Sequence, residues 1–258
     1  MRTEKRVVVI SGASSGIGLG LYNLYKEAGD IVLDISRHSN DYVCDVSDSE
    51  KLKKVIDEIY KEYGPIDILI ANAGYSVSGA VELIDETEAK KMFNVNYFGT
   101  TNLCKYAIPK MNPNGKIVCI ASAMALFPVP FQAYYSSSKA AVDNFSTCLR
   151  MELSKTKLQV TSICPSYVRT NFSKNRLKVY ETNERYGDSI KKTIEPTQKS
   201  EAKRMPQEKA VKIIYKICDK NHLKPRYIIG TKYKIFNFFR KLLPKSWMTK
   251  IINSKIKK

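Results

Sequence analysis

The sequence predicts an α/β protein: a single doubly wound parallel sheet with helices on both faces, followed by an amphipathic C-terminal extension. Short β-branched runs alternate with longer segments of helical periodicity along the 258 residues. The first run, residues 6–11, also leads through a glycine-rich turn straight into a helical stretch. A chain of this length can bury one large core. We therefore expect one main domain over residues 1–231 and a separate extension over residues 232–258.

The predicted elements follow in order along the chain. We expect strands at residues 6–11, 31–36, 42–44, 66–71, 115–121, 158–164 and 226–229, and helices at residues 17–28, 50–63, 87–111, 134–155 and 206–221. The first strand is apolar at consecutive positions, as in a strand buried on both faces. Ser47 and Glu50 have the spacing of a capping box at the start of the second helix.

The first loop has the composition of a phosphate-binding turn. Residues 11–18 read Ser-Gly-Ala-Ser-Ser-Gly-Ile-Gly, between a buried strand and a helix. Gly12 permits the tight turn, Gly16 lets the backbone approach a pyrophosphate, and Gly18 lets the helix pack closely on the strand. The N–H groups at the start of that helix would then face the phosphates. Together these features predict a dinucleotide site.

Three side chains further along have the chemistry of a proton-transfer site. Tyr135 and Lys139 lie four residues apart on one helix face, and Ser122 precedes the tyrosine by thirteen residues. A free tyrosine has a pKa of about 10, so it transfers protons poorly near neutral pH. We expect the lysine charge to lower that pKa, and the serine hydroxyl to bind a carbonyl oxygen.

With these motifs the chain resembles the short-chain dehydrogenase/reductase family, from about Lys5 to Gly230. The family motifs match at Ser11-Gly12-x-x-x-Gly16-x-Gly18, Asn72-Ala73-Gly74, Asn96, Ser122, Tyr135-x-x-x-Lys139 and Pro165-Ser166-Tyr167-Val168-Arg169-Thr170. Two positions depart from the family pattern: Ser11 replaces its threonine and Ser166 replaces its glycine. The second departure bears on the backbone beside the nicotinamide.

The resemblance implies a Rossmann fold and a role for each matching residue. Asn96, Ser122, Tyr135 and Lys139 would be catalytic, with Asn96 positioning a water that links Lys139 to solvent. Asn96 can equally be a residue that satisfies backbone groups at a helix kink. The residues expected at the cofactor are Gly12, Ser14, Ser15, Gly16, Ile17, Gly18, Ser36, Arg37, Asp45, Val46, Asn72, Ala73, Gly74, Tyr135, Lys139, Pro165, Val168 and Thr170. Asp45 would bind the adenine amino group, although a turn residue before a helix explains it as well.

The end of the second strand indicates which cofactor is preferred. A site for NAD usually places a carboxylate there to bind the adenosine ribose. Aligned on the family pattern, that position is Ser36, and Arg37 can bind a 2′-phosphate. NADP(H) is therefore favoured over NAD(H). Asp34 lies on the same side of the strand, but deeper, where we expect a structural role.

Composition restricts the remaining function classes. The six cysteines form no C-x-x-C pair and lie mostly in apolar segments, so we expect reduced thiols in a cytoplasmic protein. The two histidines, His38 and His222, are isolated, and we expect no metal. Met1 to Lys5 lead directly into the first strand, so we expect no signal peptide, and no apolar run reaches the length of a membrane span.

The C-terminal extension is basic and amphipathic. Residues 232–258 contain nine Lys or Arg and no Asp or Glu, out of a formal net charge of +18. One apolar helical face would contain Ile235, Phe236, Phe239, Leu242 and Leu243; after Pro244 a second would contain Trp247, Met248, Ile251 and Ile252. Such a segment can pack as a lid beside the substrate pocket, lie on an anionic membrane, or bind an acidic partner. The first two alternatives are compatible.

Two functions of different classes are consistent with the sequence. The first is an NADP(H)-dependent carbonyl reductase or alcohol dehydrogenase acting on a lipophilic steroid, retinoid or acyl-type substrate. The second is a catalytically weak nucleotide-binding regulator that acts through its basic tail on a membrane or a protein. The complete set of Asn96, Ser122, Tyr135 and Lys139 favours the enzyme. We expect no nucleic-acid partner, because the main domain lacks basic aromatic clusters. The resemblance implies a homodimer or homotetramer formed through the Tyr135 helix. The polar loop 171–205 says little about the substrate.

Overall fold

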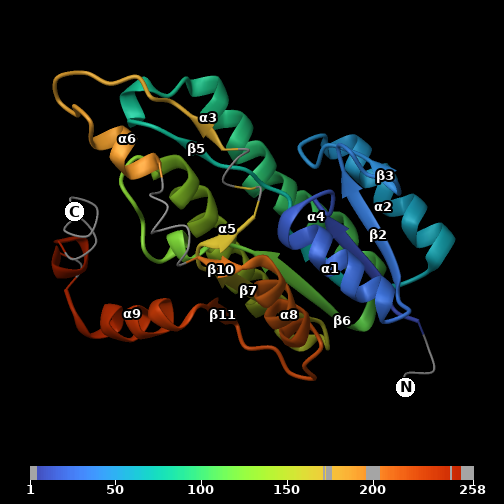
Figure 1. Cartoon of the computed structure of the whole chain (residues 1–258). Coiled ribbons are helices and arrows are strands. Elements are labelled where there is room, and N and C mark those ends of the chain that lie inside the picture. The colour runs from blue at the N-terminus through green and yellow to red at the C-terminus, as the bar shows by residue number, and fades with distance from the viewer. Residues whose placement is uncertain (1–4, 171, 173–175, 196–203, 245, 251–258) are drawn as a thin grey trace.

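The computed structural model describes residues 5–170, 172, 176–195, 204–244 and 246–250 (Figure 1). In this part of the chain seven parallel strands form one sheet, in the order β11-β7-β6-β4-β1-β2-β3. The strands are β1 (Val7–Ser11), β2 (Ile31–Ser36), β3 (Tyr42–Val43), β4 (Ile66–Ala71), β6 (Met111–Ile120), β7 (Gln159–Pro165) and β11 (Arg226–Ile229). The predicted doubly wound parallel sheet is confirmed.

Helices cover both faces of the sheet. Val8 and Ile10 of β1 pack toward α1 (Gly16–Glu27) and α8 (Gln207–Cys218). Val7 and Val9, the alternate residues of the same strand, pack toward α2 (Ser49–Tyr63), α4 (Thr100–Ala107) and α5 (Ala133–Glu152). Because side chains of a strand alternate between faces, a run that is apolar at every position is what a two-sided core needs.

The strand order reverses beside β1, which lies between β2 and β4. From β1 the chain moves outward to β2 and β3, and then crosses back to β4 on the other side. In open parallel sheets, ligands bind in the crevice that such a reversal leaves at the carboxyl ends of the strands.

Three predicted elements differ from the structure. The helix expected over residues 87–111 is α3 (Glu86–Phe93), a π-helical segment (Asn94–Gly99) and α4, and β6 begins at Met111 rather than at residue 115. A bulge opposite β4 lets β6 begin early, because Ile66 pairs with Met111 and Ile68 with Lys116. The capping box is also wrong: Asp48 caps α2 by accepting a bond from the Lys51 N–H.

Part of the predicted substrate loop is ordered by two small sheets. β9 (Leu177–Lys178) pairs with β5 (Val77–Ser78), and β10 (Met205–Pro206) pairs with β8 (Val168–Arg169). A short helix, α6 (Ser189–Ile194), lies between β9 and β10 in the chain. Residues 171, 173–175 and 196–203 of this loop lie outside the described residues.

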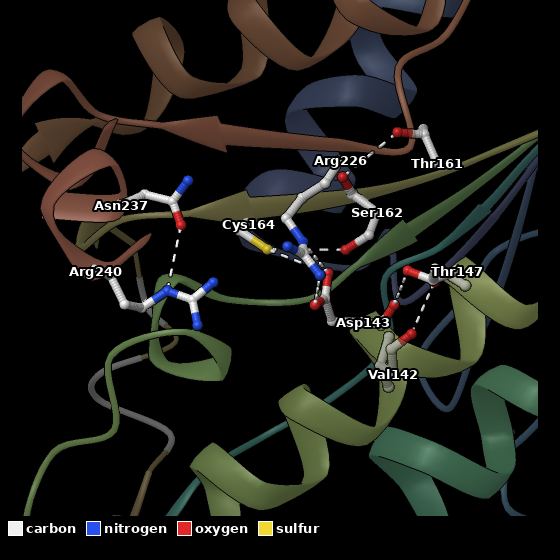
Figure 2. A network of polar contacts seen from close by, with 10 residues as sticks. Val142, Asp143, Thr147, Thr161, Ser162, Cys164, Arg226, Asn237 and Arg240 are labelled. Atoms are coloured by element: carbon white, nitrogen blue, oxygen red, sulfur yellow. Dashed lines mark hydrogen bonds and ion pairs between the residues drawn. The ribbon is translucent and has the colours of Figure 1, made fainter. Parts of the chain in front are cut away.

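A partly buried ion pair fixes β11 against α5 (Figure 2). Arg226 Nε donates to Asp143 Oδ1 at 2.7 Å, and its Nη2 contacts the other carboxylate oxygen. The Asp143 side chain is 7 % exposed and that of Arg226 34 %. The pair therefore joins the central helix of the fold to the strand after which the C-terminal extension begins.

The extension begins with α9 (Thr231–Leu242), and most of the apolar face that the sequence predicts there is exposed. Phe236 lies 6.1 Å from Phe127 between ring centroids. Ile235, Phe239 and Leu242 are instead 54 %, 46 % and 66 % exposed. In the second predicted face Met248 is buried and Trp247 is exposed, while Ile251 and Ile252 lie outside the described residues.

All six cysteines, each within the described residues, are free thiols, and Cys148 alone among them is exposed. Of the helices that the structure describes, none is long and apolar enough to cross a membrane.

Candidate active site

A cavity of about 720 Å³ lies at the carboxyl ends of the sheet strands and collects most of the predicted site residues. The predicted cofactor and catalytic residues that line it are Gly12, Ser14, Ser15, Gly16, Ile17, Ser36, Arg37, Asp45, Val46, Asn72, Ala73, Gly74, Ser122, Tyr135, Lys139, Pro165, Val168 and Thr170. Gly18 and Asn96 are not in its wall. The cavity thus runs from the glycine-rich turn to the tyrosine and lysine of α5.

The glycine-rich turn leaves backbone N–H groups free for a ligand. Ser15 precedes α1 and makes no side-chain capping bond, so the first N–H groups of the helix need another acceptor. A Cβ atom at Gly18 would lie 2.3 Å from the Gly12 carbonyl oxygen, so only glycine permits this approach of the helix to the turn. Gly16 has φ +58, a conformation that side chains rarely adopt.

The end of β4 holds this turn in place. Ser11 Oγ accepts bonds from the N–H groups of Asn72 and Ala73, at 3.0 and 3.1 Å. The Asn72 amide in turn donates to the carbonyls of Ser11 and Gly12, at 3.1 and 2.9 Å. A serine hydroxyl therefore links the end of β4 to the turn. Asn72 therefore stabilises the turn, and it also lines the cavity.

The end of β2 presents a cation to the cavity. Asp34 is 5 % exposed and accepts bonds from the Ala13 N–H at 2.7 Å and the Ser36 hydroxyl at 2.7 Å. Burial raises the pKa of Asp34. This carboxylate is committed to the protein, in the structural role expected from its depth. Arg37 is exposed and lines the cavity beside Ser36.

Asp45 has the turn role that we gave as the alternative to binding the adenine amino group. Its Oδ1 accepts bonds from the N–H and the hydroxyl of Ser47, at 2.9 and 2.7 Å. Asp45 also lines the cavity, so the turn role and contact with a bound base are compatible.

Ser122, Tyr135 and Lys139 come together from two elements. Ser122 follows β6 and caps a short 3₁₀ turn (Ala123–Ala125), accepting a bond from the Met124 N–H at 3.1 Å. That bond fixes the serine oxygen and leaves its proton able to bond Tyr135 or a ligand. Tyr135 and Lys139 project from the first turns of α5 and are 6 % and 3 % exposed.

Lys139 is a buried cation held by a neutral group. Its ammonium donates to the Ile120 carbonyl oxygen at 2.9 Å. Burial lowers the pKa of Lys139 to about 8, because water no longer solvates the charge.

Burial also raises the pKa of Tyr135 to about 12, while the Ser122 side chain and the Arg176 charge lower it in part. Our expectation that Lys139 brings the phenol toward neutral pH is therefore wrong for the protein alone, since desolvation outweighs the nearby charges.

Asn96 occupies the π-helical segment and is fully buried. Its Oδ1 accepts a bond from the Tyr75 N–H at 2.9 Å, and its Nδ2 donates to the Tyr75 carbonyl at 2.9 Å and to Ser138 Oγ at 3.1 Å. The amide thus ties the helix irregularity to the loop after β4, which is the alternative role we gave for it. Single π turns inside helices often occur at functional sites.

The sequence did not identify the other half of the cavity. Its walls near Tyr135 are Met124, Phe127, Val129, Tyr167, Phe172, Arg176 and Tyr233. The Tyr135 and Phe172 rings lie 5.8 Å apart between centroids. Tyr233 belongs to α9, and its ring centroid lies 5.8 Å from that of Phe127. These residues are scattered over four segments, and no spacing in the sequence signals that they meet.

Fold and site together define a dinucleotide-binding α/β protein with a tyrosine, a lysine and a serine at the end of its cofactor cleft. The family model described as short chain dehydrogenase matches residues 6–181. The chain belongs to this family.

Known proteins agree with that assignment. A 3-ketodihydrosphingosine reductase of Bacteroides thetaiotaomicron is 32% identical over 256 residues, which cover 95% of this chain and 94% of the relative. The crystal structure of a short-chain dehydrogenase from Streptomyces avermitilis superposes with a TM-score of 0.83 at 25% identity, over 99% of this chain and 98% of that one. ElxO with NADP bound superposes with a TM-score of 0.73 at 25% identity, over 90% of this chain and 100% of that one.

Proposed function

We propose that the protein is an NADP(H)-dependent oxidoreductase that interconverts a ketone or aldehyde with an alcohol on a lipophilic substrate. One observation carries the proposal: a single cavity joins the glycine-rich turn to Ser122, Tyr135 and Lys139. A protein that only bound a nucleotide would not need a proton donor there, which argues against the regulator.

The turn and its neighbours have the chemistry to hold the cofactor. The free N–H groups at the start of α1 suit a pyrophosphate, and Thr170 lies beside Gly16. By family resemblance Thr170 orients the nicotinamide, and Lys139 binds its ribose. When bound, the dinucleotide supplies hydride to the carbonyl carbon or accepts it from the alcohol.

Ser122 and Tyr135 would handle the oxygen of the substrate. With a pKa of about 12 the Tyr135 hydroxyl keeps its proton near neutral pH, and its donation to a carbonyl oxygen requires that charges in the loaded site, Lys139 among them, lower that pKa. Ser122, whose own oxygen is fixed by Met124, donates a second hydrogen bond to that oxygen. In the oxidative direction Tyr135 takes the proton back, and the Lys139 ammonium stabilises the phenolate formed.

The charges at the end of β2 support a preference for NADP(H). Asp34 is buried and bonded to Ala13 and Ser36, so it cannot compete for the ribose hydroxyls. Arg37 is the charged residue of this strand end that lines the cavity, and a guanidinium suits a 2′-phosphate. ElxO, which superposes on this chain, has been solved with NADP.

The apolar half of the cavity supports a lipophilic substrate. Met124, Phe127, Val129 and Phe172 surround the approach to Tyr135. Among substrates of the steroid, retinoid and acyl types, the similarity to a 3-ketodihydrosphingosine reductase supports a ketone on an alkyl chain.

The C-terminal extension, which comprises α9 and the described residues after it, would both close the pocket and contact a membrane. Tyr233 lines the cavity, whereas Phe238, Phe239 and Trp247 are 62 %, 46 % and 60 % exposed. The described basic residues Lys232, Lys234, Arg240 and Lys250 accompany this apolar surface, and the segment carries no acidic residue. We therefore propose that the otherwise cytoplasmic protein binds anionic lipid surfaces peripherally. A homodimer or homotetramer formed through α5 remains part of the proposal.

The proposed function is tested by a screen of ketones, aldehydes and alcohols with NADPH, NADH and their oxidised forms. We expect NADPH-dependent reduction of alkyl-chain ketones, with a higher kcat/KM than with NADH. If no carbonyl compound oxidises either cofactor, although both bind, the regulator becomes the better description.

A further inference from the structure

A partly buried arginine lies in the substrate half of the cavity, and among the residues that the structure describes it forms no ion pair with an acidic side chain. Arg176 lines the cavity, and its Nε is buried without a hydrogen-bond partner. A buried donor that lacks a hydrogen-bond partner is costly, so a ligand that accepts a bond from it would stabilise the site. The inference built on it rests on the proposed function, whose substrate pocket it deepens.

The position of Arg176 is set by the fold. It immediately precedes β9, which is fixed to β5 by bonds from the Leu177 N–H to the Ser76 carbonyl at 3.0 Å and from the Val179 N–H to the Ser78 carbonyl at 2.8 Å. The backbone on its C-terminal side is thus anchored to the segment that follows β4.

The charge of Arg176 acts on the proposed reaction centre. Its electrostatic influence lowers the pKa of both Tyr135 and Tyr167. The two carboxylates that line the cavity are bonded elsewhere, Asp45 by Ser47 and Glu88 by Lys91 at 2.8 Å. Burial lowers the pKa of Arg176, but an arginine remains protonated at any physiological pH.

We propose that Arg176 binds an anionic group, a carboxylate or a phosphate, on the substrate close to the carbonyl that is reduced. A guanidinium can donate two parallel hydrogen bonds to such a group, which would satisfy the buried donor. The apolar side chains of the same cavity would accept an alkyl chain. The substrate is then an amphiphile with an acidic head, and a ketone that carries an amine there is disfavoured by charge repulsion.

Binding measurements test this without turnover. Titration calorimetry on the protein saturated with NADP⁺ compares 4-oxodecanoate with its methyl ester, two ketones that differ in one negative charge. We expect the wild type to bind the acid about 10- to 100-fold more tightly than the ester. Arg176→Met should bring the two dissociation constants to within about threefold by weakening only the acid.

Lys178→Met is the matched control, because it removes a cation from β9 that does not line the cavity. It should keep the preference for the acid, and both variants should bind NADPH as the wild type does. Equal binding of acid and ester by the wild type, or no binding of the acid, overturns the inference. So does an Arg176→Met variant that binds NADPH more weakly, since Arg176 would then serve the cofactor. Reduction of neutral ketones would in those cases leave the proposed function standing.

Discussion

Arg37 offers the sharpest test of cofactor preference. It is an exposed cation at the end of β2 and lines the cavity, whereas the nearby Asp34 is held by Ala13 and Ser36. If Arg37 binds the 2′-phosphate, Arg37→Ala should weaken NADPH binding and leave NADH binding unchanged, because NADH has no phosphate at that position.

The size of the effect follows from the exposure of Arg37. A hydrogen bond to a charged group contributes about 1.5–3 kcal/mol, and an exposed ion pair about 0.2–1 kcal/mol. For an exposed arginine and a phosphate we expect about 1–2 kcal/mol, which raises the dissociation constant of NADPH roughly 5- to 30-fold. Because salt screens exposed charges, the effect should shrink between about 0.05 and 0.5 M salt.

Quenching of protein fluorescence, or calorimetry, measures the two dissociation constants. His38→Ala is the matched control, since His38 is the next exposed residue and also lines the cavity. Equal weakening of NADPH and NADH by Arg37→Ala would refute the assignment. A wild type that binds NADH as tightly as NADPH would refute the preference itself.

Three further predictions concern stability and surface. Lys139 has a pKa lowered to about 8, so the unfolded chain binds more protons between pH 8 and 10.5, and stability should rise with pH there. Measured by chemical unfolding, the free energy of unfolding of the wild type should rise by about 3 kcal/mol more than that of Lys139→Met over this pH range. Parallel plots of the two free energies against pH would contradict this prediction. Asp143→Ala leaves the Arg226 guanidinium in Figure 2 without its counter-charge; because water reaches that guanidinium, the loss should be about 1–2 kcal/mol, and a loss under about 0.3 kcal/mol would contradict the pairing. Replacing Phe238 and Phe239 together by serine should lower sedimentation with phosphatidylserine vesicles about tenfold, while the exposed Met151→Ser control should not; equal sedimentation of all three proteins would exclude the α9 surface.

The sequence predicted the strands well because those of the central sheet are buried on both faces and are therefore mostly apolar. The predicted ranges for β2, β4 and β11 agree with the structure at both ends. The start of β6 could not be predicted, since it depends on a bulge opposite Ile66 rather than on local composition. The π-helical segment at Asn96 also depends on tertiary contacts, with the Tyr75 backbone.

The phosphate half of the site was more predictable than the substrate half. Gly12, Gly16 and Gly18 lie in one short motif, because turn geometry is a local property. Arg176 enters the cavity only because β9 pairs with β5, about a hundred residues away in the chain. The pKa of Tyr135 depends on burial, which the spacing to Lys139 does not encode.

The central claim is that Tyr135 is the proton donor at a bound dinucleotide, and single-turnover reduction by the Tyr135→Phe variant tests it most directly. Mixed with excess protein, NADPH and a ketone that the wild type reduces, the variant should react at least about 1000-fold more slowly while its dissociation constant for NADPH stays within about twofold. A variant that reduces the ketone within about tenfold of the wild-type rate would contradict the account.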